Sequence, residues 1–245
     1  MLLEEPPRTQ GDVTFSLAGI PVRVHPLFWL VAVVLGLSAT RGEPFAVLVW
    51  VVAVFVSIVV HELGHAVVAR SYGFAPRITL YAMGGLASYQ SNRRDAKTQI
   101  AISLAGPVAG FLLAVLVAVA VKATDRDVMF VWGLDPIVRF GFDPFEHWAL
   151  TDFVHYMLYI NIYWGLLNLL PIYPLDGGQV ARAALTAADP QGGLWRSLWL
   201  SIFVAGGFAV YSLMHGDTYL TLLFAYMGYM SFAQLQAYGQ GGGWR

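Results

Sequence analysis

Two histidines and a glutamate share five consecutive positions in the stretch SIVVHELGHAVVAR: His61, Glu62 and His65. Residues four apart on an α-helix lie on the same face, so both imidazoles can bind one cation while the carboxylate stands beside it. This is the H-E-x-x-H pattern, in which the histidines bind zinc and the glutamate is a general base. A catalytic zinc site usually takes a third protein ligand and leaves a fourth position for water. The sequence therefore predicts a metal site that needs one more ligand.

These three residues follow a run of apolar side chains. Ser57 is the only polar residue in 45–60, and the apolar run then resumes until Arg70. If Arg70 marks the membrane boundary, His65 lies roughly 8 Å and His61 roughly 13 Å below it on a helix. An ionisable group at that depth costs at least a few kcal/mol unless it has a partner or faces a polar cavity. A polar cluster satisfied by neighbouring helices is the alternative, and this cost favours the metal site.

Depth also selects a third ligand. Asp176 lies in NLLPIYPLDGGQ, after another apolar stretch that is predicted to end on the same side of the membrane as His65. Pro171 and Pro174 stop an ordinary helix, and broken backbone at membrane depth is tolerated only where it lines a cavity or packs inside protein. The acidic residues 143, 146 and 152 fall on the opposite side. Asp176 is the predicted ligand, and a turn or helix-cap role is the alternative because Asp-Gly is a common turn pair.

The composition indicates a membrane protein. Hydrophobic residues make up 58% of the 245 and charged residues 12%, against about 25% charged in a soluble domain. The 14 basic and 15 acidic side chains nearly balance, so net charge gives no indication of a nucleic-acid partner. The chain has no cysteine, which excludes disulfides and thiolate metal sites and leaves His, Asp or Glu to bind a metal.

The apolar segments predict an all-α polytopic membrane protein with about six transmembrane helices. A helix needs about 20 predominantly apolar residues to cross the hydrocarbon core. The six candidate segments are 26–39, 45–69, 100–121, 153–170, 194–214 and 219–235. Between the second and third, β-branched and aromatic residues around a Gly-Gly turn predict a β-hairpin, and VTFSLAGIPVRV can supply further strands. We expect a small sheet at the cytoplasmic membrane surface.

The distribution of Lys and Arg predicts the orientation. With a cytoplasmic N-terminus, ten basic residues lie inside and four outside, which the positive-inside rule favours. The ten are Arg8, Arg23, Arg70, Arg77, Arg93, Arg94, Lys97, Arg182, Arg196 and Arg245, and the four are Arg41, Lys122, Arg126 and Arg139. We expect a multi-pass protein of the cell membrane with the metal site toward the cytoplasm. The acidic, Pro-rich residues 1–12 lack the pattern of a signal peptide and are expected to be an exposed tail.

The paired motifs HELGH and NLLPIYPLDGG resemble the site-2 protease family of intramembrane zinc metalloproteases. Similar features are PVRVHPLF, RITLYAMGGLASY and SLAGPVAG, and the likeness covers about residues 15–185. The resemblance implies that His61, His65 and Asp176 bind one zinc ion per chain and that Glu62 is the general base. It also implies that Asn168 helps to hold the substrate backbone or the developing oxyanion.

The resemblance further divides the chain. It implies one membrane-embedded domain over 1–245, with a catalytic core at 26–121 and 153–185 and additional spans at 194–235. Many members carry Asn where this chain has Gly110, so we assign that position no polar role. Gly106 and Gly110 are instead expected to support close helix packing. The nucleotide-binding or PDZ modules fused to some members are absent, so no fused regulatory domain is expected.

The hypothesis is an enzyme that hydrolyses a peptide bond in or near the transmembrane segment of a membrane-protein substrate, as in regulated intramembrane proteolysis. A substrate helix must unwind to expose its carbonyls, and the strands within 78–89 offer an edge to which an extended segment could add. The alternative is a divalent metal-ion transporter whose intramembrane His and Asp coordinate a passing cation. A relative that binds membrane helices without cutting them is a third possibility, against which the complete set of ligands and base argues. The remaining histidines are expected in interfacial or loop roles: His25, His147, His155 and His215.

Overall fold

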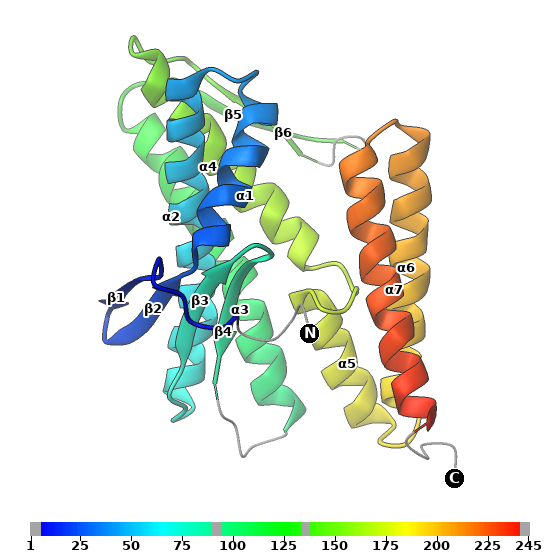
Figure 1. Ribbon diagram of the computed structural model, residues 1–245. Coiled ribbons are helices and arrows are strands. Elements are labelled where there is room, and N and C mark those ends of the chain that lie inside the picture. Colours follow the sequence, from blue (N-terminus) through cyan, green and yellow to red (C-terminus); the bar gives the residue numbers. More distant parts are fainter. Residues whose placement is uncertain (1–5, 90–94, 134–137, 241–245) are drawn as a thin grey trace.

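A computed structural model describes residues 6–89, 95–133 and 138–240 (Figure 1). The helices within these ranges are α1 (Pro26–Ala39), α2 (Pro44–Ser71), α3 (Ala96–Lys122), α4 (Trp148–Asn168), α5 (Asp176–Ala188), α6 (Gly193–Met214) and α7 (Thr218–Gln240). The strands are β1 (Val13–Leu17), β2 (Ile20–Val24), β3 (Arg77–Tyr81), β4 (Gly84–Ser88), β5 (Val128–Trp132) and β6 (Val138–Phe142). Residues 1–5 of the expected tail, and the basic residues Arg93, Arg94 and Arg245, lie outside the described ranges.

Three of the six expected spans are confirmed as helices long and apolar enough to cross a membrane: α2, α3 and α6. The other three segments are helical as well, but α1 is a shorter apolar helix. Tyrosine and amide side chains make α4 and α7 less apolar than α2, α3 and α6. In α4, for example, the amides are those of Asn161 and Asn168. The expected number of about six transmembrane helices is therefore not confirmed.

A four-stranded sheet packs against α1 and α2. Its strand order is β1-β2-β3-β4, with β2 and β3 parallel and the other neighbours antiparallel. The predicted hairpin is confirmed as β3 and β4, but its turn is formed by Ala82 and Met83, and the two glycines expected at the turn, Gly84 and Gly85, begin β4. Buried side chains of β2 and β3, including Val24 and Leu80, join Ile58 and Val59 of α2 in one apolar cluster. β4, the last strand in the order, also lies beside α2.

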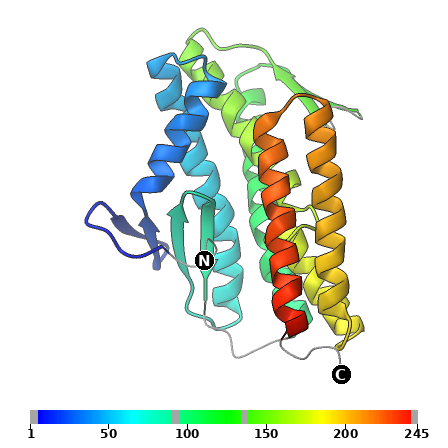
Figure 2. The same ribbon diagram turned by 45° about the vertical axis from the view of Figure 1, so that its right-hand side comes forward.

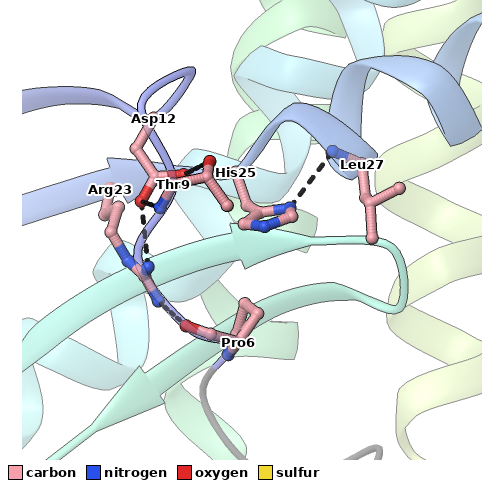
Figure 3. A network of polar contacts seen from close by, with 6 residues as sticks. All are labelled: Pro6, Thr9, Asp12, Arg23, His25 and Leu27. Atoms are coloured by element: carbon pink, nitrogen blue, oxygen red, sulfur yellow. Dashed lines mark hydrogen bonds and ion pairs between the residues drawn. The ribbon is translucent and has the colours of Figure 1, made fainter.

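Arg23 of β2 ties the segment before β1 to this sheet (Figure 3). Its guanidinium pairs with Asp12 at 3.0 Å and donates to the backbone carbonyl of Pro6 at 2.7 Å. Hydrogen bonds from the Thr9 hydroxyl and backbone, followed by the bond from Arg23, hold the pKa of Asp12 below its ordinary value. The described part of the expected tail is thus largely exposed but anchored.

The helices α6 and α7 form an antiparallel pair beside α5 (Figure 2). A second sheet, the antiparallel hairpin β5–β6, was not predicted from the sequence. Its strands run across the ends of the helices, away from the four-stranded sheet (Figure 1). Met129 and Trp132 of β5 are 67% and 75% exposed.

Candidate metal centre

The HELGH residues lie on a buried face of α2. His61, Glu62 and His65 are 4%, 5% and 7% exposed. The Nε2 atoms of the two imidazoles are 3.2 Å apart. The Nδ1 atom of His65 lies 2.7 Å from the backbone carbonyl oxygen of Ile102 on α3, and only a protonated nitrogen can donate to that oxygen. In the neutral imidazole, Nε2 of His65 therefore keeps its lone pair, which is the form that binds a metal.

Asp176, the first residue of α5, brings carboxylate oxygens to the same point. Its Oδ2 lies 3.1 Å from Nε2 of His61, and its Oδ1 lies 3.3 Å from Nε2 of His65. In the described part of the chain, these three residues form the group whose donor atoms could hold a metal ion, all within 4.8 Å of one another. Zinc with bonds of about 2.0–2.1 Å in a tetrahedron holds neighbouring donors about 3.4 Å apart. The donor set and its spacing fit a divalent ion.

Two glycines allow α5 to begin close to the end of α4. A Cβ atom at Gly177 would lie 2.1 Å from the carbonyl oxygen of Leu169, and one at Gly178 would lie 2.4 Å from that of Ile172. Both contacts are with backbone, which cannot move aside as a flexible side chain can. The Gly-Gly pair after Asp176 is therefore required for the approach that carries this carboxylate to the histidines.

Two further glycines make room for the side chains of the site. A Cβ atom at Gly106 of α3 would lie 2.1 Å from Nε2 of His65 and 2.8 Å from Nε2 of His61. On β4, a Cβ atom at Gly85 would lie 2.3 Å from Cγ of Glu62. Gly106 was expected to serve helix packing alone, because the sequence does not show that the imidazoles occupy the space beside it.

The Glu62 carboxylate is not one of the three metal donors and lies against β4. It interacts with the backbone N–H of Ala87. An N–H that faces Glu62 does not point toward β3, so the edge of β4 that β3 leaves unpaired faces the site. Tyr81, the last residue of β3, interacts electrostatically with both Glu62 and Tyr226 of α7. The carboxylate thus lies between the metal donors and the edge of β4 that has no strand partner in the described part of the chain.

Asn168, assigned to the substrate by resemblance, is the last residue of α4 and is 7% exposed. Its Nδ2 atom donates to the carbonyl of Trp164 in the same helix, at 2.9 Å. No hydrogen bond joins its side chain to the metal donors within the described ranges. An amide nitrogen has two protons, so this bond leaves the second one available.

A second buried asparagine was missed in the sequence. Asn161 is 3% exposed, and its Nδ2 atom donates to Oγ of Ser57 at 2.9 Å and to the carbonyl of Met157 at 2.7 Å. Its Oδ1 atom would lie 3.5 Å from a Cβ at Gly110, an ordinary contact distance. Ser57 precedes His61 by one helical turn, so Asn161 links α4 to α2 just beyond the metal donors. The signal was present, since an amide inside an apolar span needs a partner.

The other histidines lie apart from this group. Nδ1 of His25 accepts a hydrogen bond from the backbone N–H of Leu27 and caps α1. His155 packs against the ring of Phe140, with centroids 5.2 Å apart. His215 contacts the Tyr211 carbonyl at the end of α6. Within the described ranges, none of them belongs to the metal group.

Comparison with known proteins extends these observations. The model of peptidase family M50 matches residues 49–210, which include the HELGH residues, Asn168 and Asp176. A zinc metalloprotease of Methanocaldococcus jannaschii is 29% identical over 174 residues, which is 70% of this chain and 44% of that protein. A putative zinc metalloprotease of Mycobacterium tuberculosis is 31% identical over 191 residues, covering 69% of this chain and 42% of the relative.

A solved structure shows a related fold. The site-2 protease from Methanocaldococcus jannaschii matches with a TM-score of 0.58 and 23% identity, over 91% of this chain and 95% of that one. A putative zinc metalloprotease of Synechocystis is 27% identical over 85% of this chain and 55% of its own length. The chain thus spans about half the length of the curated relatives it matches.

Proposed function

The chain belongs to peptidase family M50, and we propose that it is a multi-pass membrane zinc metalloprotease that hydrolyses a peptide bond in or near a transmembrane segment of another protein. One observation carries the proposal. Two histidines on a membrane-spanning helix and an aspartate 111 positions beyond the second place their donor atoms within 4.8 Å, beside a buried glutamate. Relatives named zinc metalloproteases support the choice of metal and of reaction.

We assign His61, His65 and Asp176 to one zinc ion per chain. Zinc held there would supply Lewis acidity, which polarises a peptide carbonyl and makes a water molecule acidic enough to ionise near neutral pH. Glu62 then acts as the general base: its carboxylate takes the proton of the attacking water and delivers it to the leaving amine. The Ile102 carbonyl supports this chemistry by fixing the tautomer of His65.

Asn168 is assigned to the substrate. Its free amide proton can bind a backbone carbonyl or the oxyanion that develops from it, and such a donor is worth about 10²–10³ in rate at other hydrolases. The bond to the Trp164 carbonyl supports this role because it fixes the plane of the amide. Asn168 belongs to the catalytic core, which we place at residues 26–121 and 153–185 within one domain.

The unpaired edge of β4 is the proposed docking position for the unwound substrate. A segment that adds there as a strand satisfies its own backbone hydrogen bonds, which a chain at membrane depth must do. The interaction of Ala87 with Glu62 supports this position, because a strand beside Ala87 would run past the general base.

The site is proposed to face the cytoplasm. Arg70 ends α2 on the side of the four-stranded sheet, where its guanidinium contacts the Ala18 carbonyl at 2.6 Å. Arg77 is the first residue of β3 and Lys97 the second residue of α3, near the same end. The basic residues counted inside outnumber those outside, which supports this orientation. Water would then reach the site from the cytoplasmic side.

The position of Glu62 favours hydrolysis over metal transport. A transporter could use this carboxylate as another ligand, whereas hydrolysis needs it as a base, and its position outside the donor group and against β4 suits a base. We expect Glu62→Gln to retain zinc and to cut a panel of single-span substrates at least about 100-fold more slowly than wild type. Glu43→Gln, an exposed position at the start of α2, is the matched control and should cut normally. Undiminished cleavage by Glu62→Gln, or zinc uptake into vesicles without cleavage, would refute the proposal.

A further inference from the structure

The segment that joins α4 to α5 satisfies part of its backbone itself, since the N–H groups of Ile172 and Leu175 donate to the carbonyls of Leu170 and Ile172, but the N–H of Tyr173 finds its partner outside the segment. Residues 169–175 are not helical, and Pro171 and Pro174 have no N–H group to donate. The segment ends at Leu175, directly before Asp176, so its position sets that of the carboxylate. At membrane depth, an unpartnered N–H or carbonyl costs several kcal/mol. The partners of this segment are therefore part of what holds the third donor.

The helix pair α6–α7 supplies those partners through buried hydroxyls. The backbone N–H of Tyr173 donates to Oγ of Ser201 on α6 at 3.0 Å, while the single proton of that hydroxyl is shared between the Ser197 carbonyl of its own helix at 2.9 Å and the Pro171 carbonyl at 3.3 Å. On α7, the proton of the Ser231 hydroxyl is shared between the Met227 carbonyl of its own helix at 3.0 Å and the Tyr173 carbonyl at 3.4 Å. Ser201 is 2% and Ser231 is 0% exposed, so water does not compete for these bonds.

Apolar packing reinforces the same contact. Ile172, which is fully buried, and Leu175 belong to one cluster with Ala205 of α6 and with Phe224 and Met227 of α7. The two hydroxyls thus act at the polar centre of an apolar interface. The donor group found in the described chain contains no residue of α6 or α7, so an effect of these helices on the metal must be indirect, and residues 171–175 directly precede Asp176.

We propose that Ser201 and Ser231 are positioning residues that set the metal affinity of the site by fixing residues 171–175 and hence Asp176. This inference rests on the proposed metal site. It assigns a function to the additional spans α6 and α7, which is to support that site. A partner of a metal ligand typically contributes 10- to 100-fold to affinity or activity. The same range is expected for the two serines together.

Zinc affinity of the purified full chain, measured by competition with a fluorescent chelator, tests the proposal. Ser201→Ala with Ser231→Ala should bind zinc 10- to 100-fold more weakly than wild type. Ser212→Ala is the matched control, because Ser212 is 4% exposed on the same helix and lies far from residues 171–175 in sequence and along α6. Ser201→Thr, which keeps the hydroxyl, should restore much of the affinity lost in Ser201→Ala.

Thermal unfolding with and without zinc separates positioning from general stability. Loss of these buried hydrogen bonds lowers the metal-free melting temperature of the double variant, so the gain in melting temperature on adding zinc is compared, and it should be smaller than the gain of Ser212→Ala. Zinc affinity equal to that of Ser212→Ala, or a lower metal-free melting temperature with unchanged affinity, would overturn the proposal. Zinc affinity is measured without substrate, so the two proposals can fail separately. If the wild-type protein bound zinc but cleaved no substrate, the proposed protease activity would be refuted and the role of the two serines would not.

Discussion

Gly106 offers a sharp test of the site geometry. An alanine Cβ there would lie 2.1 Å from Nε2 of His65 and 2.5 Å from its Cε1. Carbon and nitrogen atoms in contact lie about 3.4 Å apart or more, so the His65 ring must move by about 1.3 Å or α3 must retreat. Zinc–donor distances tolerate only about 0.2 Å. A shift of this size therefore separates the histidine from the other donors.

The cost of this substitution can be bounded. Overpacking by one methyl group costs about 1–3 kcal/mol, which is about 5- to 150-fold in zinc affinity if the strain is relieved by losing the metal geometry. The substitution should not destabilise α3 itself, since alanine is about 1 kcal/mol more favourable than glycine in a helix interior. We expect Gly106→Ala to fold, to bind zinc about 5- to 150-fold more weakly in a chelator competition, and to lose cleavage accordingly.

The matched control lies one turn further along α3. A Cβ atom at Gly110 would be 3.5 Å from Oδ1 of Asn161, which is ordinary contact, so Gly110→Ala should bind zinc like wild type. If Gly106→Ala bound zinc as tightly as Gly110→Ala does, the imidazoles would not occupy the space beside α3, and the geometry described above would be wrong.

Two further predictions concern the substrate edge and the orientation. Ala87→Pro removes the N–H that faces Glu62 but leaves the neighbouring residues of β4 paired with β3, so this variant should cleave more slowly with unchanged zinc affinity. Ala87→Val keeps the N–H and should cleave at the normal rate. Equal cleavage rates for the two variants would exclude strand addition at this edge. Because the chain has no cysteine, single cysteines at Arg77 and Arg126 can report sidedness in intact cells. An impermeant maleimide should label only the cysteine at 126, and the reverse pattern would contradict a cytoplasmic site.

The metal donors could be found in the sequence because their signals are local. His61 and His65 are linked by helical spacing alone, and the depth argument needs only the lengths of apolar runs. The structure brings both histidines together with Asp176, as that argument requires. The hairpin at β3 and β4 was predictable for a similar reason, since its two strands lie within a dozen residues, although the turn falls on Ala82 and Met83 and not on the glycines that follow.

What the sequence did not show depends on contacts between distant elements. Gly106 and Gly85 look like packing glycines until the imidazole and carboxylate beside them are placed. Ser201 and Asn161 lie in mostly apolar helices, and their partners Tyr173 and Ser57 lie 28 and 104 positions away along the chain. The β5–β6 hairpin was overlooked because its side chains alternate weakly and exposed apolar residues are ordinary beside a membrane. Tyrosines and amides lower the hydropathy of α4 and α7, so the expected number of transmembrane helices remains a prediction.

Zinc K-edge X-ray absorption of the purified protein, loaded with one equivalent of zinc, tests the central claim most directly. The account predicts a shell of nitrogen and oxygen donors at about 2.0–2.1 Å with the outer-shell scattering of two imidazoles, and the loss of one imidazole in His65→Ala. Failure to retain zinc, or a shell without imidazole scattering, would contradict it.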